Sequence, residues 1–459
     1  MLDYLVYALG GIAGVATIAL LARRHARGLI RERRIRIDRF KLRRKHAEIR
    51  LDVFSDPEVI AAIRAYAKEH HIEVAAAERQ AHLYLTEIVP KFNLLAYYRV
   101  GAPIAKLVLH FLYRVVVERQ VIRELNQRAR KGTVVVYMIN HRSNADYLLV
   151  AHMLFKFISL SYAVGEWARV WPLNHLFKWF GAYFIRRRFR EPLYHAVLGA
   201  FVRTITKRGV TQGVFIEGGL TRDGAFLKPK LGMLDSIVSS RKDPAFTASL
   251  VIVPTAINYD RTLEDRILID ELSGADDRST RWEKLRQTSG FLFKNILRSI
   301  VRRFKRFGYA IVTFGEPIDV DSFAAEHPDL FAEPFEARKS ALRALAELTM
   351  TRISSALPIT PVPLVASVFA EASGALTDEE IVRGIERRKE AWLSRVWLTR
   401  ERTAAEIWRS ACEILEMRRL IEPIEGRWRW SPAEILLRDY YANSLLTFDE
   451  VKARGWRES

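Results

Sequence analysis

Two side chains capable of acid–base chemistry, His141 and Asp146, stand five residues apart in VVVYMINHRSNADYLLVAHML, residues 134–154. A histidine held by a carboxylate keeps its other ring nitrogen available as a base near physiological pH. Five residues of regular helix turn through roughly 500°, which would leave the two side chains about 140° apart. They can pair only if His141 precedes the helix and Asp146 lies on its first turn.

The surrounding residues supply that arrangement. Val134–Ile139 is an almost uninterrupted β-branched and apolar run, which predicts a buried strand, and Leu148–Leu154 continues as a helix. Ser143 or Asn144 can serve as the helix N-cap. Such a pair suits proton abstraction from an alcohol. A capped turn without catalytic function is the ordinary alternative, because roughly half of chains with this content of His and Asp contain one H-x4-D by chance.

A second block, GAYFIRRRF (181–189), ends a predicted strand with Arg186, Arg187 and Arg188. Guanidinium groups bind phosphate through two parallel hydrogen bonds, and open α/β sheets place ligands at the carboxyl ends of their strands. The block therefore predicts a phosphate site, with a solvated arginine cluster as the alternative.

Two further blocks follow in the chain. FIEGGLTRDGAFLKPKLGML (215–234) ends a strand with Glu217 and paired glycines, Gly218 and Gly219, which let the backbone approach a ligand closely. In VIVPTAINYD (251–260), Pro254 indicates a bulge or an edge strand near a pocket. An ordinary turn and an ordinary edge strand are the alternatives, but four such blocks at successive strand ends favour one common site. The candidate anion donors of the third block are Thr221, Arg222, Lys228 and Lys230.

In this order the blocks HRSNAD, GAYFIRRRF, FIEGGLTRDG and VIVPTAINY resemble those of the glycerol-3-phosphate acyltransferase family, including its dihydroxyacetone-phosphate relatives. The wider H-x4-D superfamily contains lysophosphatidic acid acyltransferases, and HRS, FIRR and EGG favour the glycerol phosphate branch. The resemblance covers about residues 130–320, and LRDYYANSL (437–445) is similar to the family's tail. Leu220 and Thr221 stand where the family commonly has Arg and Ser.

The resemblance implies that His141 is the general base on the sn-1 hydroxyl of glycerol 3-phosphate and that Asp146 holds its tautomer. The deprotonated oxygen then attacks an acyl thioester, acyl-CoA or acyl-carrier protein, without a covalent intermediate, cofactor or metal. The single cysteine, Cys412, is interpreted as a small filler in a helix rather than a nucleophile. The implied substrate-binding residues are Arg142, Ser143, Arg186, Arg187, Glu217, Gly218, Gly219, Thr221, Arg222, Lys230 and Pro254.

The acceptor stays open at this point, because lysophosphatidic acid or dihydroxyacetone phosphate would serve the same chemistry. The aromatic stretch VGEWARVWPLNHLFKWFGAYF (164–184) is a candidate lining for the acyl chain, with ordinary core as the alternative. Neither question changes the predicted base.

The composition is strongly basic: 73 Lys and Arg against 53 Asp and Glu give 459 residues a net charge of +20. Such a balance indicates an anionic partner, and here phosphorylated substrates, anionic donors and anionic membrane lipids all fit. A membrane-tethered nucleic-acid-binding protein is the remote alternative. No fingerprint for DNA or RNA binding is visible, and we expect no nucleic acid partner. A single cysteine also excludes an internal disulfide framework.

The N-terminal residues 4–22, YLVYALGGIAGVATIALLA, contain no charge in 19 positions, enough to cross a hydrocarbon core of about 30 Å. Twelve Lys or Arg follow between Arg23 and Lys45, which predicts a cytoplasmic location for that side. A cleaved signal peptide would carry this charge before the apolar run instead. We therefore expect an uncleaved anchor in the bacterial inner membrane, with the catalytic domain on the cytoplasmic face.

Two other segments carry membrane-like patterns. In VGAPIAKLVLHFLYRVVVERQ (100–120), Lys106, His110, Arg114 and Glu118 recur every four residues, which predicts one helix with a narrow polar stripe. That helix would lie either in the membrane interface or on the core. FLFKNILRSIVRRFKRFG (291–308) is a basic amphipathic helix with the same two interpretations.

Strands that alternate with helices after residue 133 predict an α/β fold: a mostly parallel sheet flanked by helices, with an N-terminal membrane helix and helical N- and C-terminal regions. We expect four parts: an anchor (1–22), a basic, helical, membrane-associated region (23–130), the α/β acyltransferase domain (131–330) and a helical C-terminal domain (331–459). The last contains a Pro-marked break at 357–364 and a Trp-rich, hairpin-like EGRWRWSP at 425–432.

Overall fold

The computed structural model describes residues 45–89, 102–130, 132–153, 160–164, 182–184, 189, 191–272 and 307–456. The predicted anchor (4–22) lies outside these residues, as do most of the amphipathic helix at 291–308 and most of the aromatic stretch at 164–184. Within them, no helix has both the length and the apolar character needed to span a bilayer.

One mixed sheet forms the centre of the molecule, with the strand order β1-β7-β6-β2-β5-β3-β4 and β8 paired to β6. Strands β2, β5, β3, β4 and β6 run parallel, whereas β7 and β8 pair with β6 in antiparallel orientation. The predicted, mostly parallel α/β sheet is thus confirmed. The strands are β1 (Arg114–Val117), β2 (Val134–Ile139), β3 (Leu160–Val164), β4 (Ala182–Phe184), β5 (Thr211–Phe215), β6 (Leu250–Tyr259), β7 (Tyr309–Phe314) and β8 (Ile318–Asp319).

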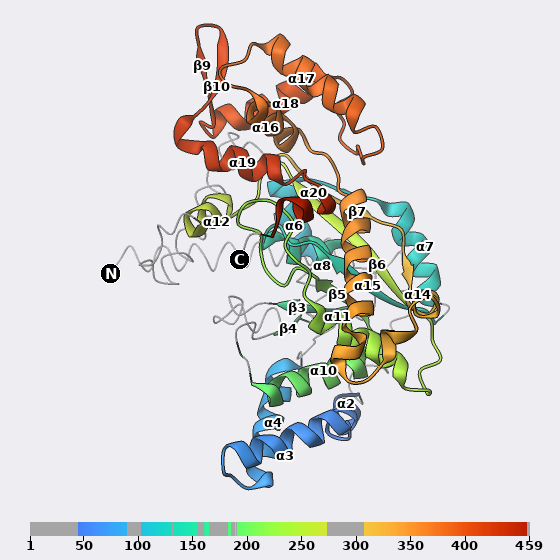
Figure 1. The fold of residues 1–459 in the computed structure, drawn as a ribbon. Helices are drawn as coiled ribbons and strands as arrows, with labels where there is room; N and C mark the ends of the chain where they lie inside the picture. The colour runs from blue at the N-terminus through green and yellow to red at the C-terminus, as the bar shows by residue number, and fades with distance from the viewer. Residues whose placement is uncertain are drawn as a thin grey trace.

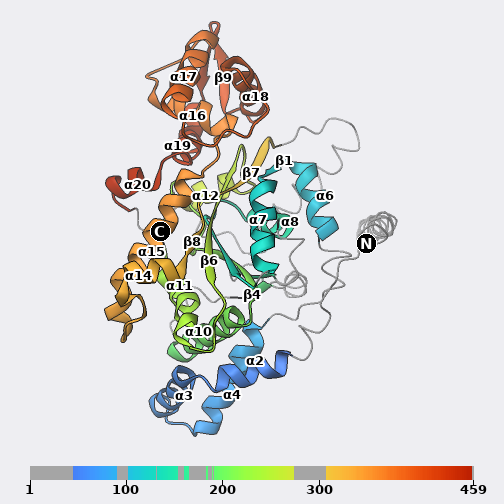
Figure 2. The ribbon, with the colours of Figure 1, turned by 90° about the vertical axis from the view of Figure 1, so that its right-hand side faces the viewer.

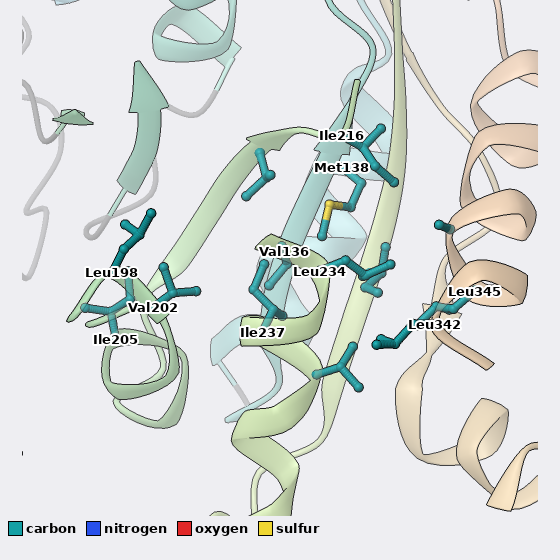
Figure 3. Packing of buried hydrophobic residues seen from close by; sticks show 14 of the residues in the cluster. Val136, Met138, Leu198, Val202, Ile205, Ile216, Leu234, Ile237, Leu342 and Leu345 are labelled. Atoms are coloured by element: carbon teal, nitrogen blue, oxygen red, sulfur yellow. The ribbon is translucent and has the colours of Figure 1, made fainter. Parts of the chain in front are cut away.

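Helices cover both faces of the sheet (Figure 2). Side chains alternate between the two faces along each strand, so each central strand contributes apolar residues to both helical layers. Val136 and Met138 of β2 pack on helices α10 (Pro192–Lys207), α11 (Leu231–Val238) and α15 (Phe335–Ser355) (Figure 3). Tyr137 and Ile139 of the same strand face the opposite layer of α6 (Ala102–Leu112), α7 (Arg119–Arg130) and α8 (Ala145–Met153) (Figure 2). A strand buried on both faces reads as a continuous apolar run, which is why β2 was predictable.

The N-terminal helices α2 (Lys45–Phe54), α3 (Pro57–Glu69) and α4 (Val74–Ile88) pack against α10 at one end of the molecule (Figure 1). Residues 70–73 separate α3 from α4. Arg203 of α10 binds Asp56 at 2.8 Å, and Asp56 also caps α3 by accepting from the Glu58 amide.

The prediction of a single helix over 100–120 is wrong. Helix α6 ends at Leu112, and Arg114–Val117 forms the edge strand β1, which pairs in parallel with β7. The three consecutive valines 115–117 favour this extended pairing, and the helical period of the polar residues around them did not reveal it. Lys106 and His110 are exposed on α6, so the polar stripe survives only on that helix.

The chain after β8 first returns to the sheet through α14 (Val320–Glu326) and α15, and then forms a separate helical unit with its own core. This C-terminal unit, residues 359–445, contains α16 (Pro361–Glu371), α17 (Asp378–Ala391), α18 (Ala404–Met417), the hairpin β9 (Ile421–Ile424) and β10 (Arg427–Trp430), and α19 (Ile435–Asn443) (Figure 1). The predicted Trp-rich hairpin is thus confirmed. Helix α12 (Asp265–Leu272) contributes to this core. Helix α20 (Phe448–Arg454) packs instead on the core between the sheet and helices α10, α11 and α15.

Candidate active site

His141 and Asp146 are paired as predicted. β2 ends at Ile139, residues 140–144 form a turn, and α8 begins at Ala145 with Asp146 in its first turn. His141 Nδ1 lies 2.9 Å from Asp146 Oδ2, and both side chains are buried, with 1% and 0% of their surface exposed. The Ser143 hydroxyl accepts from the Ala145 amide at 3.1 Å, so Ser143 caps the helix.

Asp146 is fixed by four donors. Oδ2 accepts from the backbone amides of Arg142 at 2.7 Å and Ser143 at 3.0 Å, as well as from His141. Oδ1 accepts from the Tyr259 hydroxyl at 2.5 Å. The carboxylate therefore cannot rotate away from the imidazole, and Nδ1 must carry the proton that it donates to Asp146.

The second ring nitrogen of His141 is consequently a hydrogen-bond acceptor. The Tyr147 hydroxyl lies 3.3 Å from Nε2, and the imidazole stacks on the Phe215 ring with centroids 4.1 Å apart. Aromatic side chains thus hold the ring plane, while a hydroxyl already occupies the direction in which Nε2 would accept a proton. This is the geometry that a general base toward an alcohol requires.

The third block holds the backbone of His141. Residues 217–230, here called the third-block loop, follow β5, and both Glu217 oxygens accept backbone amides: His141 at 2.6 Å and Leu227 at 2.7 Å. The Thr221 amide donates to the His141 carbonyl at 3.4 Å. Burial raises the pKa of Glu217 to about 7, although the Arg142 charge opposes this. Glu217 thus positions the turn that carries the histidine.

Arg142 is buried, with 2% of its surface exposed. Its Nη1 donates to the Gly224 carbonyl and its Nη2 to the Ser444 carbonyl at 3.4 Å, while its guanidinium carbon lies 4.8 Å from the centroid of the Phe226 ring. The side chain predicted to bind substrate is therefore directed at backbone carbonyls of the third-block loop and of the C-terminal unit.

The other predicted residues occupy different environments. Arg186 and Arg187 lie outside the described residues. Thr221 is buried, Arg222 is half-buried and Lys230 is exposed, with its amide bonded to the Ile216 carbonyl at 2.8 Å. Gly218 has φ +70°, a left-handed conformation that favours glycine, and Gly219 follows it in the same turn.

Pro254 lies inside β6 and not at an edge. It pairs with Met138 on one side, and on the other it stands where β6 changes partner from β8 to β7. The Gly315 amide donates to its carbonyl at 2.8 Å. A proline, which lacks an N–H, is tolerated at that change of partner. The pairing of the strands therefore explains Pro254, and the predicted bulge or edge near a pocket is not needed.

Two site residues were missed from the sequence. Tyr259, the last residue of β6, binds Asp146, and Glu264 accepts from the Ser143 hydroxyl and the Asn144 amide, both at 2.7 Å. Burial raises the pKa of the Glu264 carboxyl. Tyr259 closes the fourth block, so its position carried a signal, whereas Glu264 follows in a turn without any pattern. Across the described residues, no three His, Cys, Asp or Glu side chains gather to hold a metal ion.

Comparison with known proteins identifies the class first. A family model described as acyltransferase matches residues 119–258, which contain His141, Asp146 and Glu217. A second, the glycerol-3-phosphate acyltransferase C-terminal region, matches residues 293–448. The chain is thus similar to an acyltransferase domain over its central sheet and to the C-terminal region of glycerol-3-phosphate acyltransferases beyond it.

Curated relatives carry the particular name. Glycerol-3-phosphate acyltransferases from Glaesserella parasuis and Aeromonas hydrophila are 28% and 29% identical over 73% and 70% of this chain. The chain is therefore similar to glycerol-3-phosphate acyltransferases over most of its length. It spans about 40% of these relatives' length, 41% and 39% respectively.

A solved 1-acyl-sn-glycerophosphate acyltransferase from Thermotoga maritima overlaps 55% of this chain and 78% of its own, with 18% identity and a TM-score of 0.32.

Proposed function

We propose that this chain transfers a fatty acyl group from an acyl thioester to the sn-1 hydroxyl of glycerol 3-phosphate, giving 1-acylglycerol 3-phosphate, the first step of phospholipid synthesis. The observation that carries the proposal is the buried His141–Asp146 pair, whose Nε2 accepts a hydrogen bond from a hydroxyl. The names of the relatives favour glycerol 3-phosphate as the acceptor.

In the proposed reaction, the acceptor hydroxyl takes the place of the Tyr147 hydroxyl at Nε2 and gives its proton to His141. Its oxygen forms a bond to the thioester carbonyl carbon, and collapse of the tetrahedral intermediate breaks the carbon–sulfur bond. The imidazolium, stabilised by Asp146, returns the proton to the leaving thiolate. No enzyme nucleophile takes part. Burial raises the pKa of Cys412 to about 11, so this thiol is a poor nucleophile, and it lies in α18 of the C-terminal unit.

Arg186, Arg187 and Arg222 are proposed to bind the acceptor phosphate, since guanidinium groups bind phosphate in bidentate geometry. Thr221, Gly218 and Gly219 are proposed to shape the site around it. The donor, acyl-CoA or acyl-carrier protein, is anionic in both cases, which fits a chain with a net charge of +20. We further propose that residues 4–22 hold the protein in the bacterial inner membrane, with anionic lipids at its basic surface and the catalytic domain on the cytoplasmic face.

The decisive experiment follows thiol release from acyl-CoA in the presence of glycerol 3-phosphate. His141→Ala should lower turnover by roughly 10²–10⁴-fold because the general base is lost. His152→Ala is the matched control, since His152 lies in the last turn of the same helix α8 and its ring contacts the His110 ring. A folded His141→Ala protein that turns over at the wild-type rate would refute the proposal.

Acceptor identity needs a separate comparison. Glycerol 3-phosphate, dihydroxyacetone phosphate and lysophosphatidic acid are offered at equal concentration with one acyl-CoA. We expect the highest kcat/KM for glycerol 3-phosphate. A preference for either of the others would keep the acyl transfer chemistry and replace the acceptor.

A further inference from the structure

A buried side chain, Arg142, binds the turn that carries His141 to the C-terminal unit. Its neighbours come from two distant parts of the chain: Gly224 in the third-block loop and Ser444 at the end of α19, 302 residues away. We propose that Arg142 is a positioning residue that locks these three segments together, so that the C-terminal unit sets the orientation of the base. The inference rests on the proposed function, since His141 is treated as the base.

Several independent contacts join the same segments. The side-chain amide of Asn443 donates to the Asp223 carbonyl at 3.0 Å. The Tyr440 hydroxyl donates to the Arg142 carbonyl at 3.5 Å. Leu220 packs on the core of the C-terminal unit.

The backbone at Gly224 shows how closely the two parts approach. Its φ is +85°, and a Cβ on this residue would lie 1.8 Å from the Tyr440 carbonyl oxygen. Only glycine fits there. The third-block loop therefore cannot move away from α19 without breaking the contacts of Arg142. The same loop holds the His141 backbone through Glu217.

A role for Arg142 as a phosphate ligand fits these contacts less well. Its two terminal nitrogens already donate to carbonyls, and Phe226 covers one face of the guanidinium. The two carbonyls each accept from a different nitrogen of the planar guanidinium group. A lysine ammonium group cannot reach both carbonyls in this geometry.

The test compares Arg142→Lys with Asn443→Ala in the full-length protein under the assay described above. A positioning role predicts that Arg142→Lys lowers kcat by roughly 10- to 100-fold, with the KM for glycerol 3-phosphate within about twofold of wild type. Asn443→Ala, which touches no proposed ligand, should lower kcat in the same direction, and the double variant should be less than additive. Arg438→Ala on the same helix serves as the control, because Arg438 forms an ion pair with its neighbour Asp439 at 2.8 Å.

Hydrogen–deuterium exchange of peptides covering 140–144 and 217–230 supplies a measurement independent of activity, and we expect faster exchange in both test variants. A raised acceptor KM with unchanged kcat in Arg142→Lys would overturn the proposal in favour of phosphate binding. Unchanged kcat and exchange in Asn443→Ala would also overturn it, and this variant decides alone if Arg142→Lys does not fold. His141→Ala separates the two proposals, because an inactive His141→Ala beside a fully active Arg142→Lys removes only the positioning role.

Discussion

At the scale of single residues, the candidate base is fixed by side chains that a short motif does not contain. His141 and Asp146 define the pair, yet Tyr259 and Glu264 determine where it points: the first holds Asp146, and the second holds Ser143 and Asn144. Both come from the segment that closes β6. The pair is therefore supported from an adjacent strand as well as from its own turn.

Glu264 provides the prediction at this scale. Glu264→Ala leaves the Asn144 amide without its acceptor and should destabilise the fold by about 1–3 kcal/mol. It should also lower kcat, because the turn before α8 loses its support. Glu264→Gln keeps one acceptor oxygen and a donor for the Ser143 hydroxyl, so it should recover part of both losses.

Urea unfolding and initial rates measure the two effects. Equal stability and equal kcat in Glu264→Ala and wild type would contradict this role. A loss of stability alone, with kcat unchanged, would show that Glu264 supports the fold without orienting the site.

At the scale of elements, the site lies where β2, β5 and β6 end together at one edge of the sheet, as open α/β sheets arrange their ligand sites. The strand–turn–helix unit from β2 to α8 supplies the candidate base, His141, and the loop after β5 holds its backbone. The contribution of α19 is less expected, because this helix belongs to the C-terminal unit and reaches the same loop.

Gly224 gives the prediction for this contact. Gly224→Ala should lower the free energy of unfolding by at least about 2 kcal/mol, because it combines a left-handed backbone with a steric overlap. The matched control is Gly232→Ala, since Gly232 lies in α11 with open space where a Cβ would be. The control should be neutral or slightly stabilising because alanine favours helix.

Chemical denaturation of the two alanine variants checks this difference. A Gly224→Ala protein as stable as Gly232→Ala would mean that α19 does not hold the loop in place.

At the scale of the whole molecule, the sheet and the C-terminal unit meet at a buried carboxyl group. Asp260 follows β6 and accepts from the Tyr309 amide at 2.7 Å and from the Val362 amide at 2.9 Å. The segment that leaves β6 is also tied to the C-terminal unit at the start of α12, by the ion pair between Arg418 and Asp265 at 2.7 Å, with 5% and 4% of the side chains exposed. Polar groups therefore join the two cores, and both contacts are buried.

Asp260 makes the stability of the molecule depend on pH. Burial raises its pKa from 3.8 to about 7, against the effect of the Val362 and Tyr309 amides. As the pH rises, the unfolded chain loses this proton before the folded protein does. The stabilisation from protonated Asp260 is therefore complete below pH 3.8 and is lost as the pH rises through about 7. The free energy of unfolding should thus fall across this window by at most ~1.4 kcal/mol per pH unit for this proton.

Asp260→Asn tests the assignment, because all other titrating groups are common to both proteins. The variant should lose less stability than wild type between about pH 5 and about pH 7.5 in urea unfolding. Parallel stability–pH curves for the two proteins would exclude Asp260 as a source of the dependence.

The sequence by itself determined the parts that depend on neighbouring residues. The buried strands β2 and β6 were predictable from β-branched apolar runs. The pairing of His141 with Asp146 followed because a strand, a turn and a helix start leave them only one way to meet. The order of the four blocks indicated the family. Local pattern was sufficient for each of these.

Only the tertiary structure decided which side chains surround the pair. Tyr259 reaches Asp146 across 113 residues and Arg142 reaches Ser444 across 302, separations over which no hydrophobic period carries information. The same reason explains β1, since Arg114–Val117 is too short to signal a strand until β7 lies beside it. Contacts between distant segments depend on how the layers pack, and packing is settled by the whole chain at once.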